Sequence, residues 1–180
     1  MTDAEFEAAV EQIRSGDKQG LRAVYDAYGD RMYRFFLSRV HHHQDAQDLT
    51  SEYFLKLWEC LPGYRKGTGH RSWLTVIARN MATDHLRRAS REMPDDEIES
   101  SPALTQSESA EDTVISEMSM TALLERLTLD EQEIVRLHIA AQLTFREIAA
   151  VLGRPLGTVA WKYRNAIGKL QKAVKEGSPV

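Results

Sequence analysis

One stretch near the C-terminal end constrains the fold most strongly: residues 143–170, LTFREIAAVLGRPLGTVAWKYRNAIGKL. Thr144 followed three residues later by Glu147 is the pattern of a capping box, which satisfies free backbone amides where a helix begins. Gly153 can adopt the left-handed conformation that ends a helix, and Pro155 suits the beginning of a second one. Two short helices joined by a glycine turn are typical of a helix-turn-helix motif.

The second helix of this motif has one apolar side. Val159, Tyr163, Ile167 and Leu170 recur at helical spacing and indicate its buried face. The opposite face would then be free to enter the major groove of duplex DNA. An ordinary helical hairpin inside an all-α domain is the alternative. The candidate DNA-binding side chains of this motif are Arg154, Thr158, Lys162 and Arg164.

The N-terminal part of the chain shows the same helical spacing of apolar residues. Phe6 to Ile13 indicate one helix, and Ser15-Gly16-Asp17 ends it and begins the next. We expect a break at Gly29-Asp30, followed by a third helix from Met32 to Val40. The aromatic residues of these helices are expected in the core. The pattern predicts an all-α fold.

Residues 45–59, DAQDLTSEYFLKLWE, indicate a strongly amphipathic helix. Its apolar residues form a wide face that is expected to be buried. An acidic ridge beside a large core would suit a basic partner surface, and a solvated face without a partner is the alternative. The polar residues are Asp48, Ser51, Glu52 and Lys56.

A glycine-rich loop and a basic helix follow. Pro62, Gly63, Gly67 and Gly69 predict the loop, and aromatic and cationic groups on such a loop can stack unpaired bases and neutralise phosphate. Residues 72–91 then have helical spacing without Gly or Pro. From residue 65 to residue 91 there are seven basic side chains and one acidic one, so this segment is a candidate phosphate track. A plain connection and a solvated charged face are the alternatives. The polar and aromatic loop residues are Tyr64, Arg65, Lys66 and His70.

Residues 92–113 differ in character from both flanking parts. They contain eight acidic residues and no Lys or Arg, a composition typical of disordered linkers. We therefore expect two small helical domains, residues 1–91 and 114–180, joined by an acidic flexible linker.

The rest of the composition excludes several classes of protein. Cys60 is the only cysteine, so no intrachain disulfide can form, as a reducing cytoplasm would permit. The acidic N-terminus does not have the pattern of a signal peptide, and no apolar run approaches membrane length. The only candidate catalytic or metal cluster, His41 to His43 with Asp45, lacks a zinc-helix spacing. We expect a cytoplasmic protein that is not an enzyme and has no metal, cofactor or membrane insertion.

Three stretches, in this order and separation, carry a family resemblance: DAQDLTSEYFLKLW at 45–58, HRSWLTVIARNMATDHLRR at 70–88 and LTFREIAAVLGRPLGTV at 143–159. The chain resembles a bacterial RNA polymerase sigma factor of the extracytoplasmic-function (ECF) type over nearly its whole length. The resemblance implies a region 2 domain in residues 1–91 and a region 4 domain in residues 114–180. It also implies a promoter-specificity factor that helps melt DNA, with core RNA polymerase, promoter DNA and an anti-sigma factor as partners.

The resemblance implies roles for individual residues as well. The helix at 45–58 would dock on the largest polymerase subunit through Asp48, Ser51, Glu52 and Leu55. The loop and helix at 62–88 would capture flipped bases of the minus-ten element and hold the melted strand through Tyr64, Arg65, Arg71, Arg79, Asn80, Asp84 and Arg87. The helix-turn-helix would read the minus-thirty-five element in duplex form through Arg154, Leu156, Thr158, Lys162 and Arg164.

The sequence departs from the family pattern at a few positions. Residues 160–165, AWKYRN, are poorer in charge than the family's run, and Trp161 is unusual there. Ser51 stands where Gln is common, and His70 where Phe is common. Two other functions stay open: a sigma-like decoy that occupies an anti-sigma factor, and a stand-alone, dimeric helix-turn-helix repressor.

Overall fold

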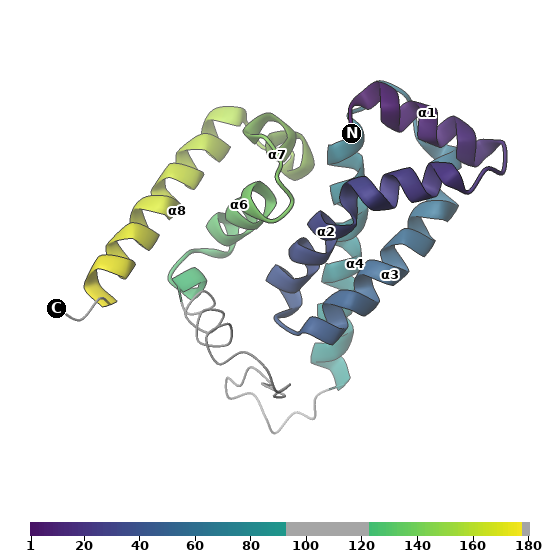
Figure 1. The fold of residues 1–180 in the computed structure, drawn as a ribbon. Helices are drawn as coiled ribbons and strands as arrows, with labels where there is room; N and C mark the ends of the chain where they lie inside the picture. Colours follow the sequence, from purple (N-terminus) through teal and green to yellow (C-terminus); the bar gives the residue numbers. More distant parts are fainter. Residues whose placement is uncertain (93–122, 178–180) are drawn as a thin grey trace.

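The computed structural model describes residues 1–92 and 123–177. These ranges contain helices and no strand, so the prediction of an all-α fold is confirmed. Figure 1 shows the helices as two groups, one from each half of the chain. The N-terminal group consists of α1 (Asp3–Arg14), α2 (Gln19–Val40), α3 (His43–Cys60), a 3-10 turn (Leu61–Gly63) and α4 (His70–Glu92). The C-terminal group consists of α6 (Leu129–Ile139), α7 (Phe145–Leu152) and α8 (Leu156–Gly177).

The predicted acidic linker, residues 92–113, lies outside the described residues except for Glu92 at the end of α4. The first part of the predicted C-terminal domain, residues 114–122, also lies outside them.

The first two helices cross closely at a glycine. A capping box of Thr2 and Glu5 begins α1, with the Thr2 amide donating to a Glu5 carboxylate oxygen at 2.7 Å. A Cβ atom at Gly20 would lie 2.4 Å from the carbonyl oxygen of Ala9. Only glycine therefore permits this approach of α2 to α1, which buries Phe6 and Val10 completely or nearly so.

Aromatic rings from α2 and α3 fill the centre of the N-terminal group. The rings of Phe36 and Tyr53 meet edge to face at 6.0 Å between centroids, and both residues are fully buried. The Tyr53 hydroxyl donates to the carbonyl oxygen of Leu74 at 3.3 Å, which ties α3 to α4. Burial raises the pKa of Tyr53 well above its usual value. The prediction that the aromatic residues of the first helices form the core is confirmed for Phe6, Tyr28 and Phe36 but is wrong for Tyr25, which is 52% exposed.

The predicted break at Gly29-Asp30 is wrong. Helix α2 runs without interruption from Gln19 to Val40. Glycine in a helix costs about 1 kcal/mol relative to alanine, but Gly29 is buried here and faces the ring of Tyr25. Tyr28, the preceding residue, and Met32, three residues later, are also buried. Their packing against the bundle offsets the weak helix propensity of a single glycine.

The predicted helix-turn-helix motif is present. The hydroxyl of Thr144 accepts from the Glu147 amide at 3.3 Å, and a Glu147 carboxylate oxygen accepts from the Thr144 amide at 2.7 Å. Gly153 ends α7 with φ +61°, in the left-handed region. Ile148 of α7 and Val159 of α8 are both fully buried where the two helices meet.

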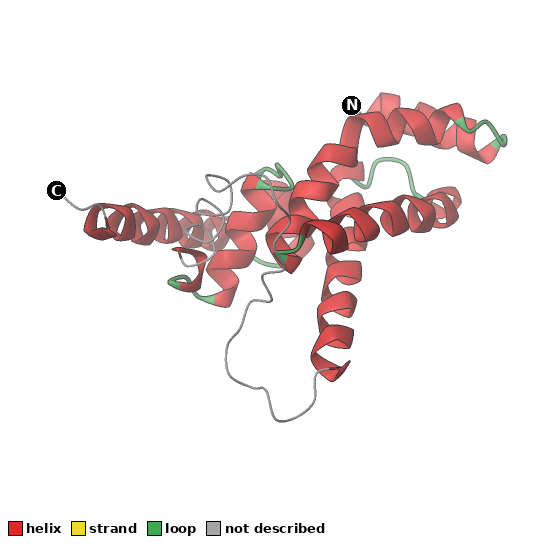
Figure 2. Cartoon of the chain, turned by 60° about the horizontal axis from the view of Figure 1, so that its bottom comes forward, coloured by secondary structure: helices red, strands yellow, loops and turns green. Residues whose placement is uncertain are grey.

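The two groups of helices pack against each other. Helix α4 lies against α7, and α2 contacts α6, and the two views in Figures 1 and 2 show the groups side by side. One continuous apolar cluster includes Phe35 and Leu74 from the first half and Ile134 and Ile148 from the second. The halves therefore share a buried contact in this structure, and a smaller apolar cluster around Val135 and Ala166 lies within the C-terminal half alone.

Candidate nucleic-acid and polymerase interfaces

The predicted polymerase-binding residues lie together on the exposed side of α3. Leu49, Tyr53 and Leu57 point into the core. The α-helical period places Asp48, Ser51, Glu52 and Leu55 on the opposite side, and all four are exposed. Leu55 is 71% exposed although it is a large apolar residue. The side thus offers one apolar residue surrounded by acidic and polar groups.

The prediction that Tyr64 stacks unpaired bases is contradicted. Tyr64 is only 3% exposed, and its ring meets Phe6 at 5.1 Å and Trp73 at 5.2 Å between centroids. Burial raises the pKa of its hydroxyl. Tyr64 is a core residue in this structure because the ring fills the space between α1 and α4, whereas the next residue, Arg65, is exposed.

Contacts with α1 fix the glycine-rich loop in place. A guanidinium nitrogen of Arg14 donates to the carbonyl oxygens of Pro62 and Tyr64, each at 3.0 Å. Glu7 accepts from the backbone amide of Gly67 at 3.1 Å, and Lys66 pairs with Glu11 at 3.2 Å. Acidic side chains of α1 therefore neutralise part of the positive charge of the loop.

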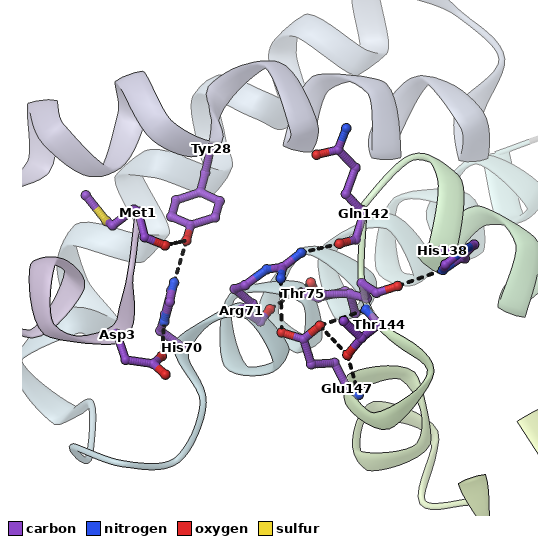
Figure 3. Close-up of polar contacts among 11 residues, drawn as sticks. Met1, Asp3, Tyr28, His70, Arg71, Thr75, His138, Gln142, Thr144 and Glu147 are labelled. Carbon is purple, nitrogen blue, oxygen red and sulfur yellow. Dashed lines mark hydrogen bonds and ion pairs between the residues drawn. The ribbon is translucent and has the colours of Figure 1, made fainter. Parts of the chain in front are cut away.

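His70 belongs to this fixed arrangement and is not a loop side chain (Figure 3). It is 2% exposed, begins α4 and stacks on Phe6 at 4.6 Å. Its ring shares hydrogen bonds with the carboxylate of Asp3 and the hydroxyl of Tyr28. The hydrogen bond from His70 holds the pKa of Asp3 below its usual value, and burial raises that of Tyr28 to about 12.

The predicted minus-ten residues on α4 divide into two groups. Asn80, Asp84 and Arg87 are exposed, and Asp84 pairs with Arg87 at 3.0 Å along the same helix. Arg71 and Arg79 instead contact the C-terminal half. Part of the predicted surface of α4 therefore faces solvent, and part of it contacts the C-terminal half of the same chain.

Arg71 bridges the two halves close to the helix-turn-helix (Figure 3). Its guanidinium group donates to the carbonyl oxygen of Gln142 and lies 3.5 Å from a carboxylate oxygen of Glu147. The same Glu147 closes the capping box of α7. A residue predicted to contact DNA is therefore anchored on the beginning of the first helix of the motif.

Arg79 is held by a second carboxylate of the C-terminal half. Its Nε donates to Glu133 at 2.9 Å, and Arg39 of α2 donates to the same carboxylate at 3.1 Å. The side chains of Glu133 and Arg39 are only 13% and 14% exposed. Burial lowers the pKa of Arg39, whereas the nearby Glu133 raises it. Arg136 adds a bond from its Nε to the carbonyl oxygen of Ser38 at 2.9 Å.

Two of the predicted minus-thirty-five residues also have an acidic partner, within their own domain. Asp130 of α6 accepts from Arg154 at 2.9 Å and from Lys162 at 2.8 Å. The hydrogen bond from Lys162 is the main cause that lowers the pKa of Asp130. Leu156 is 47% exposed, Thr158 is half-buried and Arg164 is exposed. The side chains of this motif thus form one surface at the beginning of α8.

Glu131 of α6 fixes the position of α8. It is 3% exposed and accepts from Asn165 at 2.6 Å and from Lys169 at 2.7 Å. Burial alone would raise the pKa of Glu131, but these hydrogen bonds and the capping contact with Thr128 lower it to about 2. The carboxylate is therefore ionised at neutral pH and locks α6 to α8.

Sequence reasoning missed the functional contacts of Asp130 and Glu133. The acidic residues at 130–133 suit the beginning of a helix, and the capping box of Thr128 and Glu131 agrees with that local role. Their partners lie far away in sequence, 24 residues for Arg154 and 54 for Arg79. Local spacing contains no signal for such pairs.

None of the helices in residues 1–92 and 123–177 is both long enough and apolar enough to cross a membrane. In the same ranges, no three His, Cys, Asp or Glu side chains are grouped so as to hold a metal ion. His42 caps the beginning of α3, where its ring accepts a hydrogen bond from the Asp45 amide.

Comparison with known proteins gives matches over both halves. The family models for sigma-70 region 2 and sigma-70 region 4 match residues 24–92 and 117–170. The ECF RNA polymerase sigma factor BldN of Streptomyces coelicolor is 31% identical over 179 residues, which cover 93% of this chain and 65% of BldN. The RNA polymerase sigma-H factor of Pseudomonas aeruginosa is 28% identical over 191 residues, which cover 98% of this chain and 99% of that protein.

Solved structures share the fold. CnrH, in complex with the cytosolic domain of CnrY, matches with a TM-score of 0.73 and 20% identity over 97% of this chain and 99% of that one. RpoE of Bartonella quintana, in complex with the anti-sigma factor NepR, matches with a TM-score of 0.66 and 23% identity over 87% of this chain and 98% of that one. The two sigma-70 family models and the sequence relatives lead to one conclusion. The chain belongs to the ECF type of RNA polymerase sigma factors, which are promoter-specific transcription initiation factors and not enzymes.

Proposed function

We propose that this chain directs RNA polymerase to promoters through three separate surfaces. The observation that carries the proposal is the order of the two family segments in one chain, region 2 before region 4. Both halves also present exposed helix faces, on α3 and on α8. A factor that holds polymerase and two DNA elements at the same time needs such separate surfaces.

The first surface, on α3, binds core polymerase. Leu55 would enter an apolar pocket of the partner, since exposed large apolar residues rimmed by polar groups are typical of interfaces. Asp48 and Glu52 would pair with basic groups around that pocket. Ser51 lies between them and would contribute a hydrogen bond. The exposure of all four side chains supports this assignment.

The second surface binds the minus-ten element. Arg65 from the loop and Asn80, Asp84 and Arg87 from α4 are accessible to a DNA strand. Arginines can neutralise phosphate, and amide and carboxylate groups can hydrogen-bond to the edges of unpaired bases. Arg71 and Arg79 would join this surface once the halves separate. Tyr64 is not part of it because its ring is buried.

The third surface is the beginning of α8, which would read the minus-thirty-five element. Residues at the beginning of the second helix of such a motif reach base edges in the major groove. Arg154 and Lys162 would exchange Asp130 for DNA phosphate. The remaining members of this surface are Leu156, Thr158 and Arg164.

Simultaneous use of the two DNA surfaces requires the halves to part. Two turns of duplex DNA extend about 70 Å, whereas α4 lies directly against α7 in this structure, which is therefore a closed arrangement of the two halves. Glu133 and Glu147 hold Arg79 and Arg71 with the same chemistry that phosphate would supply. We infer that polymerase and promoter binding together offset the loss of this buried contact.

A regulatory partner is also part of the proposal. CnrH and RpoE are each held in a complex with a second protein, CnrY and the anti-sigma factor NepR. We infer that an anti-sigma factor likewise binds this chain, and that the chain acts in the cytoplasm, where RNA polymerase works. No metal or cofactor enters this mechanism, because binding and capture of bases suffice for it.

Run-off transcription tests the function directly. Core polymerase is incubated with a pooled library of the source genome, with and without this protein. New discrete start sites that share two upstream elements are expected. Polymerase binding without new start sites would favour the decoy, and a dimeric free chain that binds a palindrome without polymerase would favour the repressor.

A further inference from the structure

Trp161 has no role in the core of the C-terminal half. It is the sixth residue of α8 and is 59% exposed. Val159 and Ala166 form the buried side of the helix, each fully covered, and the helical period places Trp161 almost opposite to them, beside Arg164. A large indole ring therefore projects from the outer side of the second helix of the motif.

Two glycines leave the helix bare on either side of this ring. Gly157 lies four residues before Trp161 and Gly168 seven after it, so both share its side of α8. A Cβ atom at either position would meet nothing within 4 Å, and neither has a positive φ. Glycine in a helix lowers stability relative to alanine. Because nothing within the described chain requires these glycines, their small size suits the close approach of another molecule.

Charge indicates what that molecule is. From residue 145 to residue 175 there are seven Lys or Arg residues and a single acidic residue, Glu147. This excess of basic residues in α7 and α8 fits a polyanion. The cations nearest to the motif's turn, Arg154 and Lys162, are both engaged by Asp130, which leaves an apolar ring as the prominent group at this point.

The major groove offers one apolar feature on its base edges, the C5 methyl group of thymine. We propose that Trp161 is a specificity-determining residue that places its indole ring against a thymine methyl group in the upstream promoter element, with Gly157 allowing the backbone of α8 to approach the groove. This inference rests on the proposed function and deepens it, because it names the base that this position of α8 reads.

The test uses holoenzyme assembled from core polymerase and the full chain. The probe is a promoter duplex, identified by run-off transcription, in which each thymine of the upstream element is replaced in turn by deoxyuridine, which lacks only the methyl group. With the natural chain, one replacement is expected to weaken binding about fourfold, the change that burial of one methyl-sized group is worth. With Trp161→Ala, overall binding is weaker and that same replacement has no further effect.

A second pair of variants separates recognition from folding. Gly157→Ala is expected to weaken promoter binding while the melting temperature of the free chain rises or stays unchanged, which a merely structural role would not produce. Arg164→Ala serves as the control, because it should weaken binding to the thymine and deoxyuridine duplexes equally.

The outcomes are distinct. Three results would overturn the assignment of Trp161. They are equal losses of binding at every replaced thymine for both proteins, no loss of binding at any thymine, and an upstream element that contains no thymine. Unchanged promoter binding by Trp161→Ala, together with lost binding of an anti-sigma protein, would assign the ring to a protein partner instead. If the natural holoenzyme selects no promoter at all, the proposed function itself fails.

Discussion

Glu133 of α6 accepts a hydrogen bond of 2.9 Å from Nε of Arg79 of α4. An acidic residue of the region 4 half thus neutralises an arginine that we propose for the minus-ten surface of the region 2 half. Since Arg39 of α2 donates to the same carboxylate, Glu133 contacts two helices of the N-terminal half at once. The closed arrangement and DNA binding by Arg79 compete for the same guanidinium group.

Glu133→Gln should therefore favour the open arrangement. The variant removes the negative charge between Arg39 and Arg79, and the loss of charged hydrogen bonds in a partly buried site costs roughly 1–3 kcal/mol. A change of that size shifts an equilibrium about 5- to 150-fold. Small-angle X-ray scattering of the free chain should give a larger radius of gyration.

Glu59→Gln is the matched control for this experiment. Glu59 pairs with Lys56 at 2.9 Å, but its side chain is 65% exposed and lies within α3. Exposed pairs contribute little, so its scattering should equal that of the natural chain. Equal radii for Glu133→Gln and Glu59→Gln would show that Glu133 does not hold the halves together.

Leu55→Ala should weaken binding to core polymerase without a change in folding. Leu55 is 71% exposed, so its truncation should alter the free energy of unfolding by less than about 0.5 kcal/mol. Loss of a buried anchor at an interface commonly costs roughly 1–2 kcal/mol or more, which corresponds to at least a fivefold weaker affinity. Leu129→Ala, at an 83% exposed position of α6, is the control. Similar polymerase affinities for the two variants would argue against the α3 surface.

Asn80→Ala should reduce open-complex formation and leave polymerase binding intact. Asn80 is exposed on α4, and no hydrogen bond or ion pair joins its side chain to residues 123–177. Loss of one base or strand contact is worth roughly 1–3 kcal/mol. Permanganate footprinting of the melted strand measures the effect. Gln12→Ala, an exposed position on α1, should behave as the natural chain, and a normal footprint for Asn80→Ala would remove this residue from the assigned surface.

Glu131 should make the C-terminal half sensitive to acid. Its pKa is lowered to about 2 in the folded chain, so the carboxylate stabilises the fold above its ordinary pKa of 4.5, and this contribution is lost as the pH falls from about 4.5 to 2. Glu131→Gln should lower the free energy of unfolding by roughly 1–3 kcal/mol at pH 7, and the difference should shrink in acid.

Urea unfolding followed by circular dichroism between pH 7 and pH 2.5 measures this difference. Glu5→Gln is the control, since Glu5 occupies the same capping position in α1 but is exposed. A constant gap between Glu131→Gln and the natural chain at every pH would contradict the role given to the Glu131 charge.

The predicted site residues show where sequence reasoning works and where it fails. The exposed side of α3 follows from helical spacing, because the period of a helix determines which residues face the core together. The prediction for Tyr64 fails because helical spacing says nothing about a residue in a loop. A tyrosine in a loop can face solvent or fill a gap, and only the positions of Phe6 and Trp73 decide between the two.

The sequence by itself determined the local structure of this protein: the capping boxes of α1 and α7, the turn at Gly153 and the apolar sides of the helices. These features depend on residues within about four positions of each other. Only the tertiary structure decided that α2 continues through Gly29 and that Arg71 and Arg79 lie on Glu147 and Glu133. Burial and pairing between distant segments outweigh local propensity there, because their free energy depends on neighbours that the chain brings together only when it folds.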